Sequence, residues 1–369
     1  MPETWSRRSV LQAATAAWAS RTAAQEAPGT SERPRLPRPV RVGIIGLDGH
    51  YSEVLEAAKF LSDIQVVAVA ASSPREISRF TGNRVLAAAR RYDDYRQLLD
   101  SEKLEAVALC DANHQRAASL IACAERGLAI AAEKPLVLTL EELDAVKKSV
   151  ARHGTRLTML LPMRFEPPFL AMKAIVSGGQ IGEPAALAAQ KSYQLGLRRG
   201  LRPEWMKSRR SYGGTIPFIG IHMVDLMRWI GGREFVETAA FQSTVGFPEI
   251  GEMENNAAVI YRMDNRGTAS LRLDYLRPEA ASSHGDDRLR IAGTRGVVEY
   301  RAGEVTLITA EAGLRVVQVR PRHPPLFADF LLSLDGDRKH LIAVDDVFRV
   351  TELVLRSREA AESGRVVRC

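Results

Sequence analysis

Cysteine is scarce in this sequence: its 369 residues include three, Cys110, Cys123 and Cys369. They are too few and too widely spaced for a disulfide framework or for a zinc site built on paired cysteines. We therefore interpret them as free thiols and predict no metal site.

Long apolar runs and dense basic runs are also absent. A membrane-spanning helix needs about 20 apolar residues, and Arg21 interrupts the Ala-rich run near the N-terminus. The formal charge of +7 comes from arginines spread along the chain, not from one basic run with interleaved aromatics. We expect no membrane span in the mature protein and no nucleic-acid partner. Anionic small ligands and a solvated basic surface explain the charge equally well.

The N-terminus carries a targeting pattern. Residues 6–20, SRRSVLQAATAAWAS, combine two arginines, the apolar pair Val10 and Leu11, and a short Ala-rich stretch. This pattern resembles a twin-arginine export signal. We predict a signal over 1–24, a Pro-rich linker over 25–39, and export to the periplasm or another extracytoplasmic compartment. An Ala-rich extension of a cytoplasmic protein is the alternative.

The chain is long enough for two domains, each with its own core. After the linker, short apolar runs alternate with amphipathic stretches; the runs are VRVGIIG, VVAVAAS, AVALC and AIAAE. Strands buried on both faces that alternate with helices are typical of a doubly wound parallel sheet of the Rossmann type, which we predict over 40–155. Its ligands are expected at the carboxyl edge of the strands.

In the second part of the chain the spacing of apolar residues changes. From about residue 178 to 320 the apolar residues recur with period two, as in AAVIYRM, GTASLRLDYL and GVVEYR. This alternation predicts a largely antiparallel open sheet with one covered face. We assign 156–369 to a C-terminal α+β domain.

The stretch GIIGLDGHY at 43–51 follows the first predicted strand. In a G-x-G-x-x-G dinucleotide fingerprint, the three glycine positions fall on Gly46, Asp48 and Tyr51, so only the first glycine is present. An acidic side chain near a pyrophosphate is unfavourable unless it turns away. An ordinary Asp-Gly turn without phosphate binding is therefore an open alternative.

If this turn binds a pyrophosphate, the amides must come from Gly49, His50 and Ser52, at the start of the next helix. Ser52 is also a plausible N-cap of that helix. The turn after the second strand offers Ser72, Ser73 and no acidic residue at the strand end.

Arg75 follows that pair of serines. Serine and arginine side chains suit a 2′-phosphate, which favours NADP over NAD. A solvated loop is the alternative.

Several further motifs occur in a characteristic order: DANHQRA (111–117), EKPL (133–136), RFEPPF (164–169), GQIGEP (179–184), GGTIPFIGIHMVDLMRWIGG (213–232) and DDVFRVTELVLRSREAAESGRVV (345–367). From about residue 40 to the end, the chain resembles the glucose-fructose oxidoreductase and inositol dehydrogenase (Gfo/Idh/MocA) family. The resemblance implies a Rossmann domain that binds NAD or NADP and a second domain that covers the nicotinamide and often mediates oligomers. It implies a sugar, cyclitol or polyol substrate and a homo-oligomer.

The resemblance also implies roles for individual residues. Lys134 matches the lysine that contacts the oxidised hydroxyl, and Glu133 stands beside it in the motif. Near a cationic nicotinamide ring the ammonium form of such a lysine is disfavoured, which suits proton exchange. Asn113 matches an asparagine beside the cofactor.

The second catalytic motif of the family, D-x-G-x-H-x-x-D, is incomplete. Gly220, His222 and Asp225 match it, but Phe218 replaces the first aspartate. Either His222 acts as base unaided, or the chemistry is not a simple alcohol oxidation. Asp225 is positioned to orient the imidazole if the segment is helical.

Three other residues are candidates for substrate binding, namely Arg164, Tyr193 and Trp205, the last by stacking on a sugar ring.

Three functions remain open. The first is an exported oxidoreductase that acts on a sugar or polyol with tightly bound NAD or NADP. The second is a cofactor-free carbohydrate-binding or assembly protein. The third is a redox-neutral, NAD-dependent glycoside hydrolase or lyase.

Overall fold

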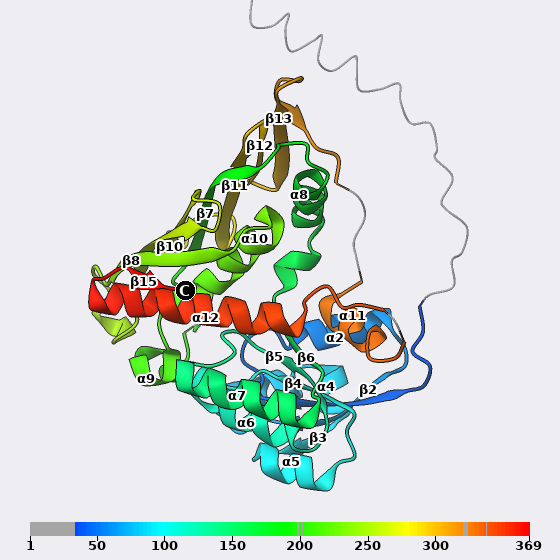
Figure 1. The fold of residues 1–369 in the computed structure, drawn as a ribbon. Helices are drawn as coiled ribbons and strands as arrows, with labels where there is room; N and C mark the ends of the chain where they lie inside the picture. Colours follow the sequence, from blue (N-terminus) through cyan, green and yellow to red (C-terminus); the bar gives the residue numbers. More distant parts are fainter. Residues whose placement is uncertain (1–33, 198, 201, 320–323, 337) are drawn as a thin grey trace, which may run out of the picture. The chain divides into compact units, whose positions relative to one another are not determined.

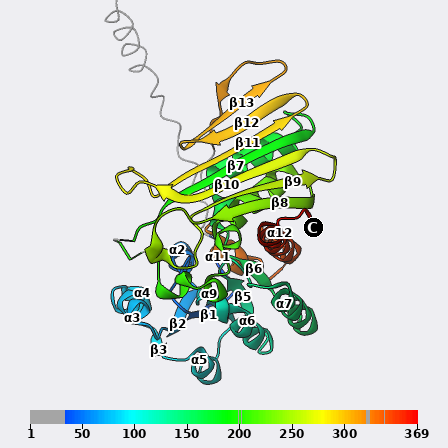
Figure 2. The same cartoon turned by 90° about the vertical axis from the view of Figure 1, so that its left-hand side faces the viewer.

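The computed structural model describes residues 34–197, 199–200, 202–319, 324–336 and 338–369. The predicted signal and residues 25–33 of the predicted linker lie outside these residues. The segment 35–369 forms one compact unit, which contains two sheets (Figures 1 and 2). No helix in the described ranges is long and apolar enough to cross a membrane.

The first sheet is parallel throughout and has the order β3-β2-β1-β4-β5-β6. Its strands are β1 (Val40–Ile45), β2 (Ile64–Ala70), β3 (Arg90–Tyr92), β4 (Ala106–Leu109), β5 (Ala129–Ala132) and β6 (Leu157–Met159). The central strands β4 and β5 are buried along their whole length, because helices cover both faces. This order is that of a dinucleotide-binding Rossmann fold and confirms the predicted class.

The helices between these strands are α2 (Ser52–Phe60), α3 (Pro74–Thr81), α4 (Arg84–Ala87), α5 (Tyr95–Ser101), η1 (Asn113–Gln115), α6 (Arg116–Ala124) and α7 (Leu140–His153). Local signals explain their ends. Thr139 caps α7 by accepting a hydrogen bond from the Glu142 amide, and Gly154 ends it in the left-handed conformation.

The sixth strand, β6, lies just beyond residue 155, so the predicted domain boundary falls one strand too early. The sequence did not reveal this strand because three residues are too few to show a strand period.

The second sheet has nine strands in the order β14-β13-β12-β11-β7-β10-β9-β8-β15, and all pairs are antiparallel except β7 with β10. Its strands are β7 (Pro184–Gln194), β8 (Phe235–Ser243), β9 (Asn256–Met263), β10 (Thr268–Arg277), β11 (Gly285–Gly293), β12 (Gly296–Arg301), β13 (Glu304–Thr309), β14 (Arg315–Val316) and β15 (Val367–Arg368). The predicted, largely antiparallel sheet is confirmed.

Helices cover one face of this sheet, as Figure 1 shows. They are α8 (Pro167–Ser177), α10 (Ile221–Gly231) and α12 (Val344–Ser363). Along β10, Leu271 and Leu273 are buried under the helices while Arg272 between them is exposed. The remaining elements are η2 (Pro162–Phe165), η3 (Glu204–Lys207), α9 (Arg209–Tyr212), the π-helix η4 (Ile216–Gly220), η5 (Pro248–Ile250) and α11 (Leu326–Leu332).

Candidate active site at the carboxyl edge of the first sheet

The turn after β1 needs its first glycine for packing. Gly46 has a φ of +77°, and a Cβ at this position would lie 2.4 Å from the Cα atom of Asp111 in the turn after β4. The Gly46 amide donates to the Ala70 carbonyl at the end of β2. Gly46 therefore lets the ends of three strands meet at one point, beside the expected ligand edge.

Asp48, at the position of the second fingerprint glycine, turns toward α3 and η3. Its Oδ1 lies 3.0 Å from Nη1 of Arg79 and 3.6 Å from Nε of Arg75. Its Oδ2 accepts a hydrogen bond of 3.0 Å from the Trp205 indole. Because two guanidinium groups balance this carboxylate, the turn carries no uncompensated negative charge. Arg75 also donates to the Gly200 carbonyl through Nη1.

Some backbone amides of this turn donate hydrogen bonds within the protein, and others do not. The Asp48 amide donates to the Cys110 carbonyl, and the His50 amide donates to Oε2 of Glu133 at 2.8 Å. Among the described residues, the amides of Gly49 and Ser52 make no hydrogen bond. The expectation that Ser52 caps α2 is wrong: the N-cap is Tyr51, without a side-chain bond, because α2 begins at Ser52 itself.

Glu76, in the first turn of α3, is an acidic residue close to the end of β2 whose role the sequence did not reveal. Its Oε1 accepts the Leu47 amide at 3.0 Å, while its Oε2 accepts the amides of Ser72 and Ser73 at 3.3 and 3.1 Å. Ser73 in turn caps α3, which completes a capping box with Glu76. The pattern Ser-x-x-Glu before a helix was the available signal.

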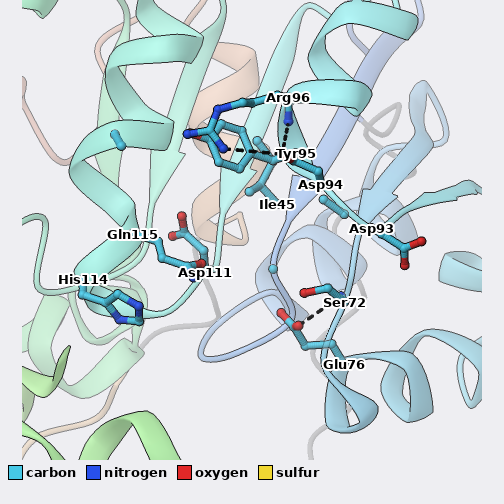
Figure 3. A pocket seen from close by; sticks show the side chains of 13 residues that line it. Ile45, Ser72, Glu76, Asp93, Asp94, Tyr95, Arg96, Asp111, His114 and Gln115 are labelled. Carbon is cyan, nitrogen blue, oxygen red and sulfur yellow. Dashed lines mark hydrogen bonds and ion pairs between the residues drawn. The ribbon is translucent and has the colours of Figure 1, made fainter.

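A cavity of about 490 Å³ opens beside Glu76. Figure 3 shows that side chains from the ends of β1, β2 and β4 and from α5 surround it. Its acidic lining residues are Glu76, Asp93, Asp94 and Asp111, against one arginine, Arg96. This lining differs from the basic loop that the sequence led us to expect.

Glu133 and His50 join the turn after β5 to the fingerprint turn. The buried Glu133 carboxylate lies 2.9 Å from Nδ1 of His50. Burial alone would raise the pKa of Glu133, but His50 and Lys134 lower it to about 2. Gly49 has a φ of +84°, and a Cβ there would lie 2.6 Å from the Glu133 carboxyl carbon. The missing side chain of Gly49 therefore leaves room for this carboxylate.

Lys134 projects from the same turn into the second domain. Its Nζ donates to the Phe218 carbonyl at 3.0 Å and lies 3.6 Å from the centroid of the Phe218 ring. Burial lowers the pKa of Lys134 to about 7, although Glu133 opposes the shift. The amine is thus partly neutral near pH 7, as proton exchange requires.

His222 lies on α10 and is 4% exposed. Its ring packs edge-on against His50 with centroids 5.6 Å apart, and its buried Nδ1 has no partner among the described residues. Burial, followed by the charges of Lys191 and Lys134, holds the pKa of His222 well below its usual value. The structure therefore brings together two bases, Lys134 and His222, whose charged forms are disfavoured.

Arg164 and Asp225 form a buried structural pair, and the roles expected for them are corrected. Arg164 donates to both Asp225 oxygens, at 2.8 and 2.6 Å, and to Asp346 on α12 at 2.9 Å. Both carboxylate oxygens of Asp225 are occupied in this way, so Asp225 does not orient His222. Arg164, at 1% exposure, has no free face for a substrate.

Of the remaining candidates, Asn113 and Trp205 make contacts between the two domains, and Tyr193 stacks on a neighbouring ring. Asn113 donates to the Tyr212 carbonyl on α9 at 2.9 Å, so it ties the turn after β4 to the second domain. Trp205 is held by Asp48 and meets the Phe218 ring edge-on. Tyr193 stacks on His284 with centroids 4.6 Å apart.

The sequence reasoning also missed Lys191. It is buried on β7, with its Nζ 4.8 Å from the Tyr193 ring. A lysine at an inward position of an alternating strand was the signal in the sequence.

In the described part of the chain, no group of three or more His, Cys, Asp or Glu side chains is placed to hold a metal ion.

Two family models match the chain, one over the part that forms the first sheet and one over most of the part that forms the second. Residues 40–161 match the model of an oxidoreductase family with an NAD-binding Rossmann fold, and residues 169–299 match the model of the GFO/IDH/MocA C-terminal domain. A solved Thermotoga maritima protein described as an oxidoreductase superposes with a TM-score of 0.84 at 31% identity, over 89% of this chain and 100% of that one.

Two curated relatives are more distant. The chain is 26% identical to the myo-inositol 2-dehydrogenase of Thermotoga maritima over 281 residues, which are 75% of this chain and 80% of the relative. It is 28% identical to an uncharacterised oxidoreductase of Bacillus subtilis over 228 residues, or 62% of this chain. That second match spans 64% of the relative, less than two thirds of its length.

The Arg164–Asp225 pair predicts a stability effect. Asp225→Ala leaves a buried guanidinium without its main partner, so we expect the free energy of unfolding to fall by about 3–5 kcal/mol in urea denaturation. Asp345→Ala, at the exposed start of α12, serves as the control and should cost less than about 1 kcal/mol. Unchanged stability together with a further lowered pKa of His222 would instead indicate that Asp225 interacts with the imidazole.

Proposed function

Since the chain belongs to the Gfo/Idh/MocA family of NAD-binding oxidoreductases, we propose that it interconverts a hydroxyl and a carbonyl of a sugar or polyol. One observation carries the proposal: two buried bases with lowered pKa, Lys134 and His222, stand beside the carboxyl edge of a Rossmann sheet. The name of the Thermotoga relative, a myo-inositol dehydrogenase, supports a polyol.

The residues at the sheet edge fit a dinucleotide. Glu76 lines the cavity after β2, and its Oε1, which accepts one amide hydrogen bond, has a lone pair left for a ribose hydroxyl. The amides of Gly49 and Ser52, just before and at the start of α2, make no hydrogen bond within the described ranges and suit an anion. Glu133 and Asn113, which follow β5 and β4, would face the nicotinamide end of the dinucleotide. When bound, the dinucleotide supplies the hydride acceptor or donor.

The protein contributes the proton transfer. The neutral amine of Lys134 accepts the proton of the reacting hydroxyl, and the buried Nδ1 of His222, which has no partner among the described residues, binds or relays it. Phe218 supplies no acid or base at the position of the family aspartate. Its carbonyl and ring hold Lys134 instead.

We further propose that the protein works after export and keeps its cofactor. The twin-arginine pattern motivates the first part, because that route carries folded proteins. Asp48 motivates the second. Its carboxylate accepts a hydrogen bond from Trp205 on η3 and lies near Arg75 on α3, and Arg75 in turn donates to the Gly200 carbonyl.

Cofactor retention provides the principal test. Purified protein should carry nicotinamide dinucleotide through gel filtration, and Asp48→Asn should release it about tenfold faster because a charge-assisted link worth ~1.4 kcal/mol is lost. Fluorescence of the bound reduced cofactor gives the release rate. Asp100→Asn, which breaks an exposed pair with Arg126, should leave the rate unchanged. Native protein without dinucleotide and without uptake would favour the cofactor-free carbohydrate-binding or assembly function.

The acidic lining of the cavity predicts a preference for NAD over NADP, because Glu76 repels a 2′-phosphate. Glu76→Gln keeps the shape of the capping residue and removes its charge. We expect the ratio of the NADP and NAD dissociation constants, measured by calorimetry, to fall about tenfold in this variant, or ~1.4 kcal/mol. Glu125→Gln, on the surface after α6, is the control. Tighter binding of NADP by the native protein would contradict the assignment.

Lys134 predicts the pH dependence of turnover. Its pKa lies near 7 in the folded protein, below its usual value, so the neutral base is populated above about pH 7 and lost below it. For alcohol oxidation, kcat/KM should rise by up to about tenfold per pH unit below pH 7 and level off above. Lys134→Arg stays cationic and should lower kcat at least about 100-fold. Lys173→Arg, outside the site, is the control, and a flat profile in the native enzyme would exclude Lys134 as the base.

A further inference from the structure

Arg116, the first residue of α6, is completely buried next to the ligand edge of the first sheet. Burying a guanidinium costs desolvation, and a buried ion pair often stabilises a fold no better than apolar packing would. The groups that Arg116 contacts therefore have to explain why a charged residue stands at this position.

The main hydrogen bonds of Arg116 go to backbone carbonyls of two turns. Nη1 donates to the Pro135 carbonyl at 2.7 Å, in the turn after β5, and Nη2 donates to the Asp111 carbonyl, in the turn after β4. Pro135 directly follows Lys134 in the chain. The guanidinium thus bridges two turns of the ligand edge, and one of them carries the proposed base.

A further contact extends this bridge to the second domain. Nη1 of Arg116 also donates to Oδ1 of Asn113 at 3.2 Å, and Nδ2 of Asn113 donates to the Tyr212 carbonyl on α9 at 2.9 Å. Lys134 reaches the second domain at another point, through the Phe218 carbonyl at 3.0 Å. Arg116 therefore supports the domain contact in which the amine of Lys134 is buried.

The carboxylate of Asp111 holds the guanidinium in place. Its Oδ1 lies 3.3 Å from Nε of Arg116, and its Oδ2 accepts a hydrogen bond of 2.7 Å from Ser119, one turn along α6. Asp111 also lines the cavity beside Glu76, as Figure 3 shows. Because Asp111 engages Nε, the two Nη atoms of Arg116 remain to hold the turns.

The charge of Arg116 acts on the same amine. The charged and titratable groups that interact with Lys134 come from both domains, and they are Glu133, Lys191, Arg116, Arg202 and His222. Burial lowers the pKa of Lys134 most; Glu133 raises this pKa, and the three cations lower it. A fixed cation near the turn thus favours the neutral amine, which is the form that accepts a proton.

We propose that Arg116 is a positioning residue for proton transfer: it holds the turn after β5 by the Pro135 carbonyl and so keeps the amine of Lys134 buried against Phe218. The inference rests on the proposed oxidoreductase function for the role of Lys134 as base. In that reaction the proton of the hydroxyl passes to the amine, and Arg116 exchanges no proton because its guanidinium stays charged.

The test follows the titration of Lys134 in the purified protein. With 13C-labelled lysine, the chemical shift of the ε-carbon reports the protonation of the amine, and Lys134→Arg identifies its signal. We expect a native midpoint at about pH 7. In Arg116→Met the midpoint should rise by about one pH unit, because a like charge is lost and the turn is no longer held.

The conservative variant separates charge from geometry. Arg116→Lys keeps the charge but loses the fork of donors that holds two turns, so its midpoint should rise less than that of Arg116→Met. For alcohol oxidation, Arg116→Met should lower kcat at pH 7 about 5- to 10-fold, change KM less than about threefold, and move the rise of kcat/KM to higher pH.

Arg41→Met is the matched control. Arg41 also holds a backbone carbonyl, that of Lys103 at 2.7 Å, and pairs with Glu102, but it lies at the opposite end of β1 from the ligand edge. This variant should leave the midpoint unchanged. If Arg116→Met does not fold by circular dichroism, the double variant with Asp111→Asn removes both buried charges and answers the same question.

The outcomes separate the two proposals. An unchanged midpoint of Lys134 in the folded Arg116→Met or double variant, or an equal rise in Arg41→Met, overturns the positioning role and leaves the oxidoreductase function intact. A midpoint that rises in Arg116→Met, in a protein that neither holds nor takes up dinucleotide, supports the positioning role and overturns the oxidoreductase function.

Discussion

The site depends on the burial of one amine between two domains. Nζ of Lys134 leaves the turn after β5, reaches the Phe218 carbonyl in the π-helix η4, and lies under the Phe218 ring. Desolvation of that amine lowers its pKa, and the same packing places it near His222 on the following helix. Without this contact, the first sheet would supply a nucleotide edge but no base.

The two departures from the family pattern have structural explanations. Asp48 replaces a glycine that normally lets a backbone approach a pyrophosphate, yet its carboxylate is turned to Arg79 and Trp205. Phe218 replaces an acid, yet its ring and carbonyl hold Lys134, the proposed base. Both residues serve contacts between the domains, so their presence is compatible with an intact site and is not by itself a sign of lost function.

Buried polar groups in the second domain differ in how fully they are satisfied. Arg164 is fully engaged with Asp225 and Asp346, which ties η2, α10 and α12 together. The Lys191–Asp287 pair lies on the sheet, and within the described part of the chain Oδ1 of Asp287 has no hydrogen-bond partner. Complete satisfaction of the Arg164 pair suits a structural role.

Local and periodic features of the chain were sufficient for the fold class, since buried strand runs and period-two alternation depend on neighbours in sequence. They also located Gly46, Lys134 and His222 through motifs. The partners of these residues came only from tertiary structure. Asp225 stands three residues from His222 on one helix, but its oxygens face Arg164, 61 residues away. Glu76 reaches the amide of Leu47, 29 residues away, and Lys191 meets Asp287 across 96 residues. Direction and pairing of polar side chains are decided by which distant groups lie within hydrogen-bond reach, and sequence spacing does not contain that information.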